Sequence, residues 1–368
     1  MIYNWQQMDW PEFRYDLDGL ADQLLVFAND AGRVSGLLEG MPEELETEAV
    51  LDFMIAEAVG SSAIEGETLN RDAVMSSIRN RLGLNPVPLT VDSRMADAAG
   101  ELMVAVRSSF RVPLTEDTLF AWHRMLLGGT FGLRIGGWRE GGDPMQVVSG
   151  SIDRPTVHFE APPAEQVPAE MARFIAWFND TAPSGPKAIS HPPLRSALAH
   201  LYFESIHPFE DGNGRIGRAL SEKVLSQGLG RPAIISLSRS IDARRKDYYE
   251  ALKVAQRGNE VTDWVHWFVG VIGQAQRDAC DQVRFVLRKS RFFQRYAPEL
   301  NERQLKIVRR IFQAGPEGFI GGMNARKYLA LTGASKATVT RDLQHLAQLG
   351  ALTPIGGGRS THYELGES

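Results

Sequence analysis

Residues 207–218 read His-Pro-Phe-Glu-Asp-Gly-Asn-Gly-Arg-Ile-Gly-Arg and place an imidazole, two carboxylates, an amide, glycines and two guanidiniums close together. Glycines let backbone N–H groups approach phosphate oxygens, and arginines present planar forks that match phosphate. Asp211 offers the hard oxygens that Mg²⁺ uses together with substrate phosphates. His207 can accept a proton near neutral pH. The run therefore predicts a site that handles a nucleoside triphosphate.

The flanks of this run predict how it is presented. Apolar residues recur at helical spacing on both sides, at Leu194, Leu198, Leu201, Tyr202 and Ile206 before it and at Ile216, Leu220, Val224 and Leu225 after it. The run is then a tight loop between two helices, with Gly212 to Gly214 opening the second. A helix N-terminus has unpaired N–H groups and a partial positive charge, so it attracts anions. Arg215 and Arg218 share one face of that helix.

The same run resembles the HxFx(D/E)GNGRxxR signature of Fic-domain proteins at every specified position. The resemblance implies an enzyme that transfers AMP from ATP, with Mg²⁺, to a Ser, Thr or Tyr hydroxyl of a protein and releases pyrophosphate. It also implies a mainly α fold, a helical core with a small β-hairpin flap that holds the target backbone by strand addition. Doc-type relatives, which transfer the γ-phosphoryl group, carry Lys where this chain has Gly214, and Gly214 argues against that branch.

The resemblance also implies a role for each residue of the run. His207 would take the proton from the target hydroxyl, and Phe209 would anchor the loop by packing. Asp211 would bind the nucleotide through Mg²⁺. Asn213 and the Gly212 and Gly214 amides would contact the α- and β-phosphates. Arg215 would contact the β-phosphate and Arg218 the γ-phosphate. Tyr248 and Tyr249 lie in a segment that resembles a helix bordering the nucleotide in the family, so they would line the adenosine pocket. Packing in the aromatic core explains these two tyrosines equally well.

A second resemblance lies upstream, where Ser61-Ser62-Ala63-Ile64-Glu65-Gly66 matches the inhibitory pattern (S/T)xxxE(G/N) of the family. It implies that Ser61 and Glu65 lie against the active loop and that Glu65 pairs with Arg218 in the place of the γ-phosphate. Residues 35–40 match the pattern too, but Gly36 weakens a helix there, whereas residues 44–64 form a longer amphipathic run. An alternative role for Glu65 is to position a water that removes AMP from a modified protein.

The chain is expected to divide into three domains: an N-terminal helical domain with the inhibitory helix (1–110), the Fic core with the helices that follow it (111–295), and a winged helix (296–368). In the core, Thr115 should cap a helix, and Pro168 should open an amphipathic one. Residues 136–139 should form a hairpin together with 146–148 and 156–159. Asp242 should cap a helix that runs through the paired tyrosines to Ala255.

The last 68 residues differ in charge from the rest of the chain. They hold nine basic and five acidic residues, a net charge of +4 against −9 for the remainder. Their pattern predicts helices near 305–312, 324–331 and 336–349, the last capped by Ser335, followed by strands at 352–355 and 361–365 around a glycine-rich turn. This order is typical of a winged helix–turn–helix whose third helix, with Lys336 and Arg341, reads DNA. Contact with another protein is the alternative use.

Composition excludes several classes of protein. The single cysteine, Cys280, rules out an internal disulfide and a site built from several cysteines, and it suits a reducing compartment. The sequence contains no run of about eighteen apolar residues, so it predicts no membrane span. The N-terminus lacks the pattern of a signal peptide. We therefore expect a cytoplasmic protein with no membrane partner. Its expected partners are a protein substrate, which can be a copy of the protein itself in autoadenylylation, and DNA. The sequence does not decide the oligomeric state, and a homodimer is one of the possibilities. The competing class is a DNA-binding regulator whose Fic fold senses nucleotide.

Overall fold

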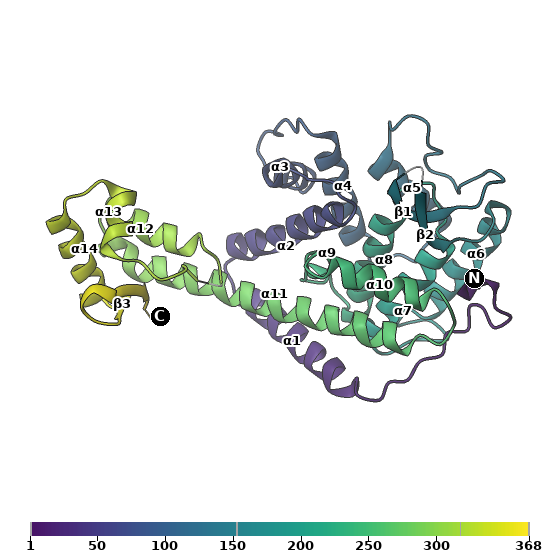
Figure 1. The fold of residues 1–368 in the computed structure, drawn as a ribbon. Helices are drawn as coiled ribbons and strands as arrows, with labels where there is room; N and C mark the ends of the chain where they lie inside the picture. The colour runs from purple at the N-terminus through teal and green to yellow at the C-terminus, as the bar shows by residue number, and fades with distance from the viewer. Residues whose placement is uncertain (1, 152–153, 317, 367–368) are drawn as a thin grey trace. The chain divides into compact units, whose positions relative to one another are not determined.

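Helices make up most of the chain, and two short antiparallel hairpins supply the strands of the residues that the structure describes, 2–151, 154–316 and 318–366 (Figure 1). The predicted mainly α fold with a small hairpin is confirmed in this computed structural model. Its elements are α1 (Ala21–Glu39), α2 (Glu43–Ile64), α3 (Arg71–Arg81), α4 (Arg94–Ser108), α5 (Glu116–Leu127), β1 (Gln146–Ser151), β2 (Arg154–Glu160), α6 (Val167–Asp180), α7 (Pro192–Ile206), α8 (Asn213–Leu229), α9 (Leu237–Asp242), α10 (Arg245–Ala255), α11 (Thr262–Tyr296), α12 (Glu302–Phe312), α13 (Ala325–Thr332), α14 (Lys336–Gln348), β3 (Leu352–Ile355) and β4 (His362–Leu365).

The chain divides into two compact units, 1–33 with 47–279 and 34–46 with 280–368. The three-domain division at 110 and 295 stays a prediction. Within the described residues no helix combines the length and the apolarity that a membrane span needs. Glu317 and Glu367, two of the acidic residues counted above, lie outside the described residues.

The core of the larger unit forms around α7 and α8. Helix α7 starts with proline at its first position, where the missing N–H is not needed, and α8 begins and ends at Gly212 and Gly230, both in the left-handed conformation. The core is rich in aromatic side chains, with Trp10, Trp122, Trp138, Phe174, Tyr202, Phe203 and Phe209 all buried. The tryptophan-containing N-terminus belongs to this core, because Trp10 packs edge-on against Tyr202 and donates a hydrogen bond to Glu170 at 2.9 Å.

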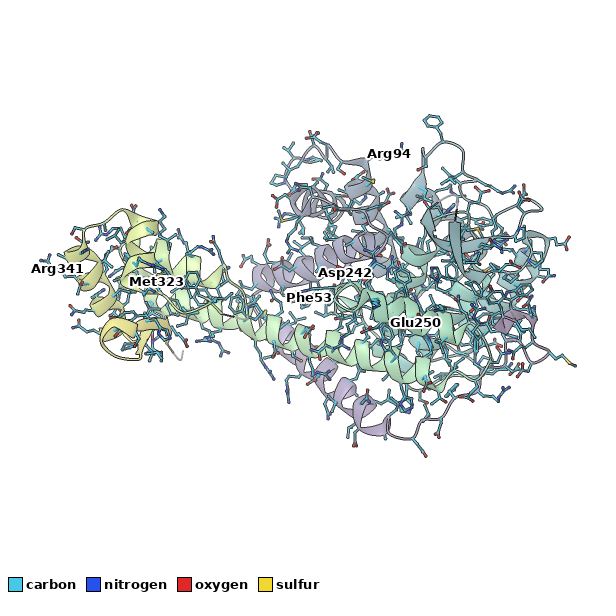
Figure 2. The ribbon with its side chains drawn as sticks, viewed as in Figure 1. Phe53, Arg94, Asp242, Glu250, Met323 and Arg341 are labelled. Carbon is cyan, nitrogen blue, oxygen red and sulfur yellow. The ribbon has the colours of Figure 1, made fainter. Side chains whose placement is uncertain are left out.

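Local signals predicted the helices of the larger unit well, with two exceptions. Thr115 caps α5 by accepting a hydrogen bond from the Thr118 N–H at 3.1 Å, as predicted. Asp242 does not cap a helix; it ends the short α9, and α10 begins at Arg245 without a side-chain cap (Figure 2). Residues 136–139 are not part of the hairpin, which β1 and β2 form alone. Burial decides the second case, because Trp138 and Arg139 are drawn into the core beside the 207–218 loop.

The smaller unit contains the predicted three helices and hairpin in the expected order. Asn301 and Gln304 form a capping box on α12, and Ser335 caps α14 through the Thr338 N–H at 3.3 Å. Met323, labelled in Figure 2, extends the β3–β4 hairpin by exchanging two backbone hydrogen bonds with Tyr363, at 2.8 and 2.6 Å. Arg341 lies on the exposed face of α14.

Candidate functional site

His207 stands where α7 ends and the 207–218 loop begins, and its backbone is held in an unusual conformation. It is the only non-glycine residue with positive φ (51°) among those that the structure describes. Arg139 stabilises this conformation, because its Nε donates to the His207 carbonyl at 2.8 Å and its backbone N–H donates to the Pro208 carbonyl at 2.9 Å. Burial lowers the pKa of Arg139 to about 10, so the clamp stays charged at neutral pH.

Phe209 and Asn213 fix the middle of the loop. Phe209 is fully buried and stacks on the His123 ring, with centroids 4.1 Å apart, as expected of a packing anchor. The Asn213 side chain accepts a hydrogen bond from the Phe209 N–H at 2.9 Å and donates one to the Phe209 carbonyl at 2.8 Å. Its amide is therefore occupied in holding the loop, which leaves the backbone N–H at the start of α8 for a ligand anion.

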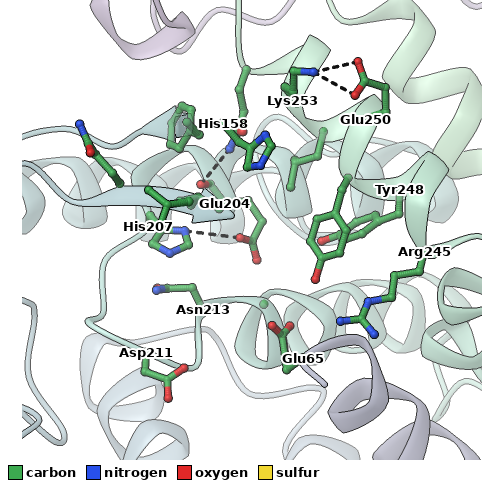
Figure 3. Close-up of a pocket in the computed structure, with 18 of the residues that line it drawn as sticks. Glu65, His158, Glu204, His207, Asp211, Asn213, Arg245, Tyr248, Glu250 and Lys253 are labelled. Atoms are coloured by element: carbon green, nitrogen blue, oxygen red, sulfur yellow. Dashed lines mark hydrogen bonds and ion pairs between the residues drawn. The ribbon is translucent and has the colours of Figure 1, made fainter. Parts of the chain in front are cut away.

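A pocket of about 640 Å³ opens over this loop (Figure 3). Its lining brings together most of the residues selected from the sequence: Glu65, His207, Asp211, Gly212, Asn213, Gly214, Tyr248 and Tyr249. Val147, Val148 and His158 of the β1–β2 hairpin line another side, where a strand-forming target would lie if the hairpin binds it. Arg215, Arg218 and Ser61 are not among the lining residues, because the segment that holds Glu65 and Glu67 covers the two arginines.

Glu65 and Ser61 cover Arg218. Arg218 Nη2 donates to Glu65 Oε1 at 2.7 Å and to the Ser61 carbonyl at 2.8 Å, and its Nε donates to Ser61 Oγ at 3.0 Å. Burial alone lowers the pKa of Arg218, but Glu65, Tyr248 and Glu204 together outweigh burial and the pKa is raised. Gly214 permits this contact, because a Cβ there would lie 2.3 Å from Glu65 Oε1. The carboxylate thus lies against the first turn of α8, where an anionic phosphate would bind.

Arg215 is covered as well, by a residue to which the sequence assigned no role. Its Nη1 donates to both carboxylate oxygens of Glu67 at 2.9 Å, and its Nη2 lies 3.4 Å from Asp211 Oδ1. Arg215 Nε and Arg218 Nη1 are buried and have no hydrogen-bond partner among the described residues. Both guanidiniums therefore keep an unused donor that a phosphate oxygen could satisfy.

Asp211 fits the predicted role of an Mg²⁺ ligand. Its side chain is half exposed at the rim of the pocket, and its Oδ1 also accepts from the Gly212 N–H at 2.5 Å. The described residues contain no group of three acidic, histidine or cysteine side chains that would hold a metal alone. A single carboxylate is suited to an ion that arrives with nucleotide phosphates, because Mg²⁺ usually combines one or two carboxylates with those phosphates.

Helix α2 is fixed to the core one turn before Ser61. Glu57 is buried and accepts hydrogen bonds from the Ser238 N–H at 2.8 Å and from the Ser238 hydroxyl. Gly60 lies so close to α9 that a Cβ would be 2.9 Å from the Arg239 nitrogen. At the end of α2, Arg245 and Tyr249 donate to the Ala63 and Ile64 carbonyls at 3.0 and 3.2 Å.

Glu222 of α8 gives this junction a pH dependence. Burial, followed by the nearby negative charge of Glu57, raises the pKa of Glu222 from 4.5 to about 8. Between these two values the folded protein retains a proton that the unfolded chain has lost, so raising the pH favours unfolding. We expect Glu222 to contribute a decrease in stability of up to about 1.4 kcal/mol per pH unit in this window. Urea unfolding of wild type and Glu222→Gln from pH 5 to 8 measures it, and equal slopes would contradict it.

The two tyrosines differ in their surroundings. Tyr248 is buried, and its hydroxyl lies 2.8 Å from His200 Nε2. Tyr249 is 41% exposed and reaches the end of α2. Tyr248 thus serves the aromatic core and the pocket wall together, while Tyr249 mainly faces the pocket. Their contact with adenosine stays a prediction.

Sequence reasoning missed three residues that contact the proposed machinery. Arg139 clamps the His207 backbone, Glu67 binds Arg215, and Glu204 lies 3.6 Å from His207 Nδ1. Only Glu67 left a local signal, because it stands two residues after Glu65. Arg139 is 68 positions from His207, so no spacing rule connects them. Glu204 occupies the apolar helix before the loop, where a charged residue is itself unusual.

Comparison with known proteins supports a division of the chain by similarity. Residues 113–225 match the Fic/DOC family, residues 3–84 match a domain of unknown function (DUF4172), and residues 319–366 match the C-terminal domain of DIP2311-like transcriptional regulators. A protein adenylyltransferase Fic from Nematostella vectensis is 29% identical over 202 residues, which are 54% of this chain and 42% of that protein. The chain thus matches less than half the length of this relative.

Solved structures are similar in fold. A Fic family protein from Desulfovibrio desulfuricans G20 gives a TM-score of 0.55 at 22% identity and covers 97% of this chain and 98% of its own. A Fic domain containing signaling protein from Bacteroides thetaiotaomicron gives 0.55 at 20% identity, over 71% of this chain and 96% of its own. The loop and much of the pocket lining thus lie in the region of the chain, residues 113–225, that matches the Fic/DOC family, and the fold is similar to that of solved Fic structures.

Proposed function

We propose that the protein transfers AMP from ATP to a hydroxyl side chain of a target protein, itself included, and that Glu65 holds this activity low. The observation that carries the proposal is the position of His207, which lines the same pocket as the glycine-rich start of α8. An imidazole near an anion-binding helix terminus is what hydroxyl attack on a phosphate requires. We also infer a cytoplasmic location, in keeping with the single cysteine.

In the proposed reaction ATP binds with Mg²⁺ as substrate, and Asp211 would hold the ion. His207 accepts the proton of the target hydroxyl while its oxygen forms a bond to the α-phosphorus. The bond from that phosphorus to the oxygen bridging to the β-phosphate breaks, and pyrophosphate leaves. The N–H groups that open α8, together with Arg215 and Arg218, stabilise the negative charge on the phosphates. At rest, Glu65 occupies Arg218 and excludes this arrangement.

Intact mass after incubation with ATP and Mg²⁺ tests the proposal. Glu65→Gly should gain adducts of about 329 Da, the mass of one AMP unit, while wild type gains few. Glu65→Ala removes the same carboxylate without the added backbone freedom of glycine, and it should behave in the same way. If Glu65 instead positions a hydrolytic water, modified wild type should lose AMP with time and the Glu65 variants should keep it. No adduct on any variant or on added lysate proteins would contradict transferase activity.

A second candidate function is DNA binding by the smaller unit. Its residues 319–366 match part of a transcriptional regulator, and α14 exposes Lys336, Thr340 and Arg341 on one face. Such a face is typical of a helix that contacts DNA in the major groove. If it binds DNA, Lys336→Ala/Arg341→Ala should weaken binding about tenfold or more and should lower its salt dependence. Equal binding by wild type and variant in a gel-shift titration at two salt concentrations would exclude this face.

A further inference from the structure

Glu204 is a buried carboxylate without a role in the reaction described so far. It lies on the last turn of α7, three residues before His207, and it is 4% exposed. Its Oε2 is 3.6 Å from His207 Nδ1, a distance that suits an ion pair and exceeds a hydrogen bond (Figure 3). Glu204 Oε1 and His207 Nδ1 are both buried without a hydrogen-bond partner among the residues described. His207 Nδ1 thus lacks a partner that the Glu204 carboxylate can provide through Oε2.

The surroundings of Glu204 favour its charged form. Burial alone raises the pKa of Glu204, but His207, His200 and Arg218 outweigh burial and the pKa is lowered. The charged and titratable groups around it come from its own helix (His200, His207), from α8 (Arg218) and from α10 (Tyr248). A buried carboxylate that stays ionised needs a positive partner close by. Protonated His207 would be that partner.

The loop backbone sets the direction of the imidazole. The positive φ of His207 and the clamp of Arg139 on its carbonyl turn the ring so that Nδ1 faces α7. Nε2, on the opposite edge of the ring, is then the nitrogen available to the pocket. For Nε2 to accept a proton, Nδ1 must carry one, and a carboxylate beside Nδ1 selects that tautomer.

We propose that Glu204 is the positioning residue of His207, holding the proton on Nδ1 and stabilising the imidazolium that forms when Nε2 takes the proton of the target hydroxyl. The inference rests on the proposed adenylyl transfer. No further reactant is needed, because the proton moves from the hydroxyl to Nε2 as pyrophosphate leaves and is afterwards released to water. The 3.6 Å gap then shortens to a hydrogen bond in the charged state, as catalytic hydrogen bonds often do.

Glu204→Gln in the Glu65→Gly protein tests this assignment. The amide has nearly the same shape, but it carries no charge and its NH₂ group can donate to Nδ1, which selects the tautomer that cannot accept at Nε2. We expect kcat to fall about 10²-fold or more, the affinity for ATP to stay within about threefold, and the acidic limb of the rate–pH profile to move to lower pH. Glu222→Gln, another buried glutamate changed in the same way, should leave the rate and the profile unchanged.

A measurement without turnover separates this inference from the proposed function. Nitrogen-15 shifts of labelled histidine, with His207 identified from its loss in His207→Ala, report the tautomer directly. We expect the Nδ1–H form in Glu65→Gly at pH 8 and the Nε2–H form or a mixture in Glu204→Gln. Melting temperatures confirm that both proteins are folded. An unchanged tautomer or unchanged kcat would overturn the role of Glu204, whereas the absence of any transfer with a changed tautomer would overturn the transferase proposal alone.

A separate observation concerns Glu67 and Arg215. Gly66 has a φ of 85°, which reverses the chain after Glu65, and the Glu67 N–H donates to the Ser62 carbonyl at 3.0 Å. This turn aims the Glu67 carboxylate at Arg215, whose side chain is 8% exposed. Two successive acidic residues of one short segment therefore each neutralise one of the two arginines of the loop motif.

We infer that Glu67 is a second inhibitory carboxylate, which occupies Arg215 as Glu65 occupies Arg218. It too rests on the proposed function, because it matters only if Arg215 binds a phosphate. A nucleotide must exchange a hydrogen-bonded carboxylate for its phosphate at both arginines. Removing Glu65 alone would leave the second competition in place. Full activity would then require the whole turn of residues 65–67 to leave the arginines.

Titration calorimetry with ATP and Mg²⁺ tests the inference on Glu65→Gly and Glu65→Gly/Glu67→Gln. A charge-assisted contact of this kind is expected to change affinity about tenfold, so the second protein should bind ATP about tenfold more tightly. Glu250→Gln, which removes a charge from the pocket wall where Glu250 pairs with Lys253, controls for a general electrostatic effect. Equal gains in ATP affinity from Glu67→Gln and Glu250→Gln, or no gain from Glu67→Gln, would overturn the inhibitory role of Glu67. No ATP binding by any variant would overturn the proposed function with it.

Discussion

Replacing His207 with alanine in the Glu65→Gly protein is expected to slow AMP transfer by about 10² to 10⁴-fold, the usual contribution of a general base. The imidazole is the titratable group that the αL turn at the end of α7 brings into the pocket, with Nδ1 on the side of Glu204. ATP should still bind within about threefold, because the phosphate contacts proposed for α8 and its arginines do not involve His207. Single-turnover incorporation of AMP labelled at the α-phosphate measures the rate.

His191 offers the matched control. It lies at the other end of α7, is exposed, and makes no side-chain cap to that helix. His191→Ala should therefore transfer AMP at the rate of its parent. A His207→Ala protein that keeps more than a tenth of the parent rate would remove the imidazole from the chemistry, and the pocket would then need another base.

Phe209→Ala should have the largest effect on stability among the loop residues. The ring is fully buried, stacks on His123 and lies 5.2 Å from the Trp138 ring. Deleting a buried phenylalanine costs about 3–5 kcal/mol through lost burial and the cavity that remains. This is a large part of the 5–15 kcal/mol that holds a typical domain folded. Transfer activity should fall too, because the backbone of Phe209 holds Asn213 at the start of α8.

Urea unfolding followed by circular dichroism measures the change in free energy. Phe131, 99% exposed, supplies a control of the same chemistry, and Phe131→Ala should stay within about 0.5 kcal/mol of wild type. A Phe209→Ala protein with wild-type stability would show that the loop does not depend on its anchor. Loss of activity without loss of stability would assign Phe209 to the site and not to the core.

Residues near in sequence were predicted well, and residues brought together by folding were not. Thr115 and Ser335 were identified because a capping side chain acts on the N–H groups of the next turn. The same local rule predicted that Asp242 caps a helix, and that prediction was wrong because the short α9 ends at Asp242.

The residues of the candidate site divide in the same way, into those that are near in sequence and those that only folding brings together. The 207–218 loop was readable as a whole because its groups are neighbours in the chain, and the pocket is lined by His207 and by residues 210–214 of this loop. Arg139 could not be found, because its contact with the His207 carbonyl joins residues 68 positions apart. The prediction that Trp138 belongs to a hairpin with 146–148 and 156–159 was wrong, because Trp138 is buried against Phe209.

The close approach of Gly60 to α9 limits how the inhibitory segment can release the arginines. Because Gly60 touches the Arg239 backbone and Glu57 is bonded to Ser238, α2 cannot swing away as a rigid rod without breaking the core. Under the proposed inhibition, the part that would open is the end of α2 and the turn after it, residues 61–67. Such an opening costs far less free energy than unfolding and recurs spontaneously on short timescales. Under this proposal the resting protein would exchange between closed and open ends, and a nucleotide or partner that prefers the open end would set its activity by population.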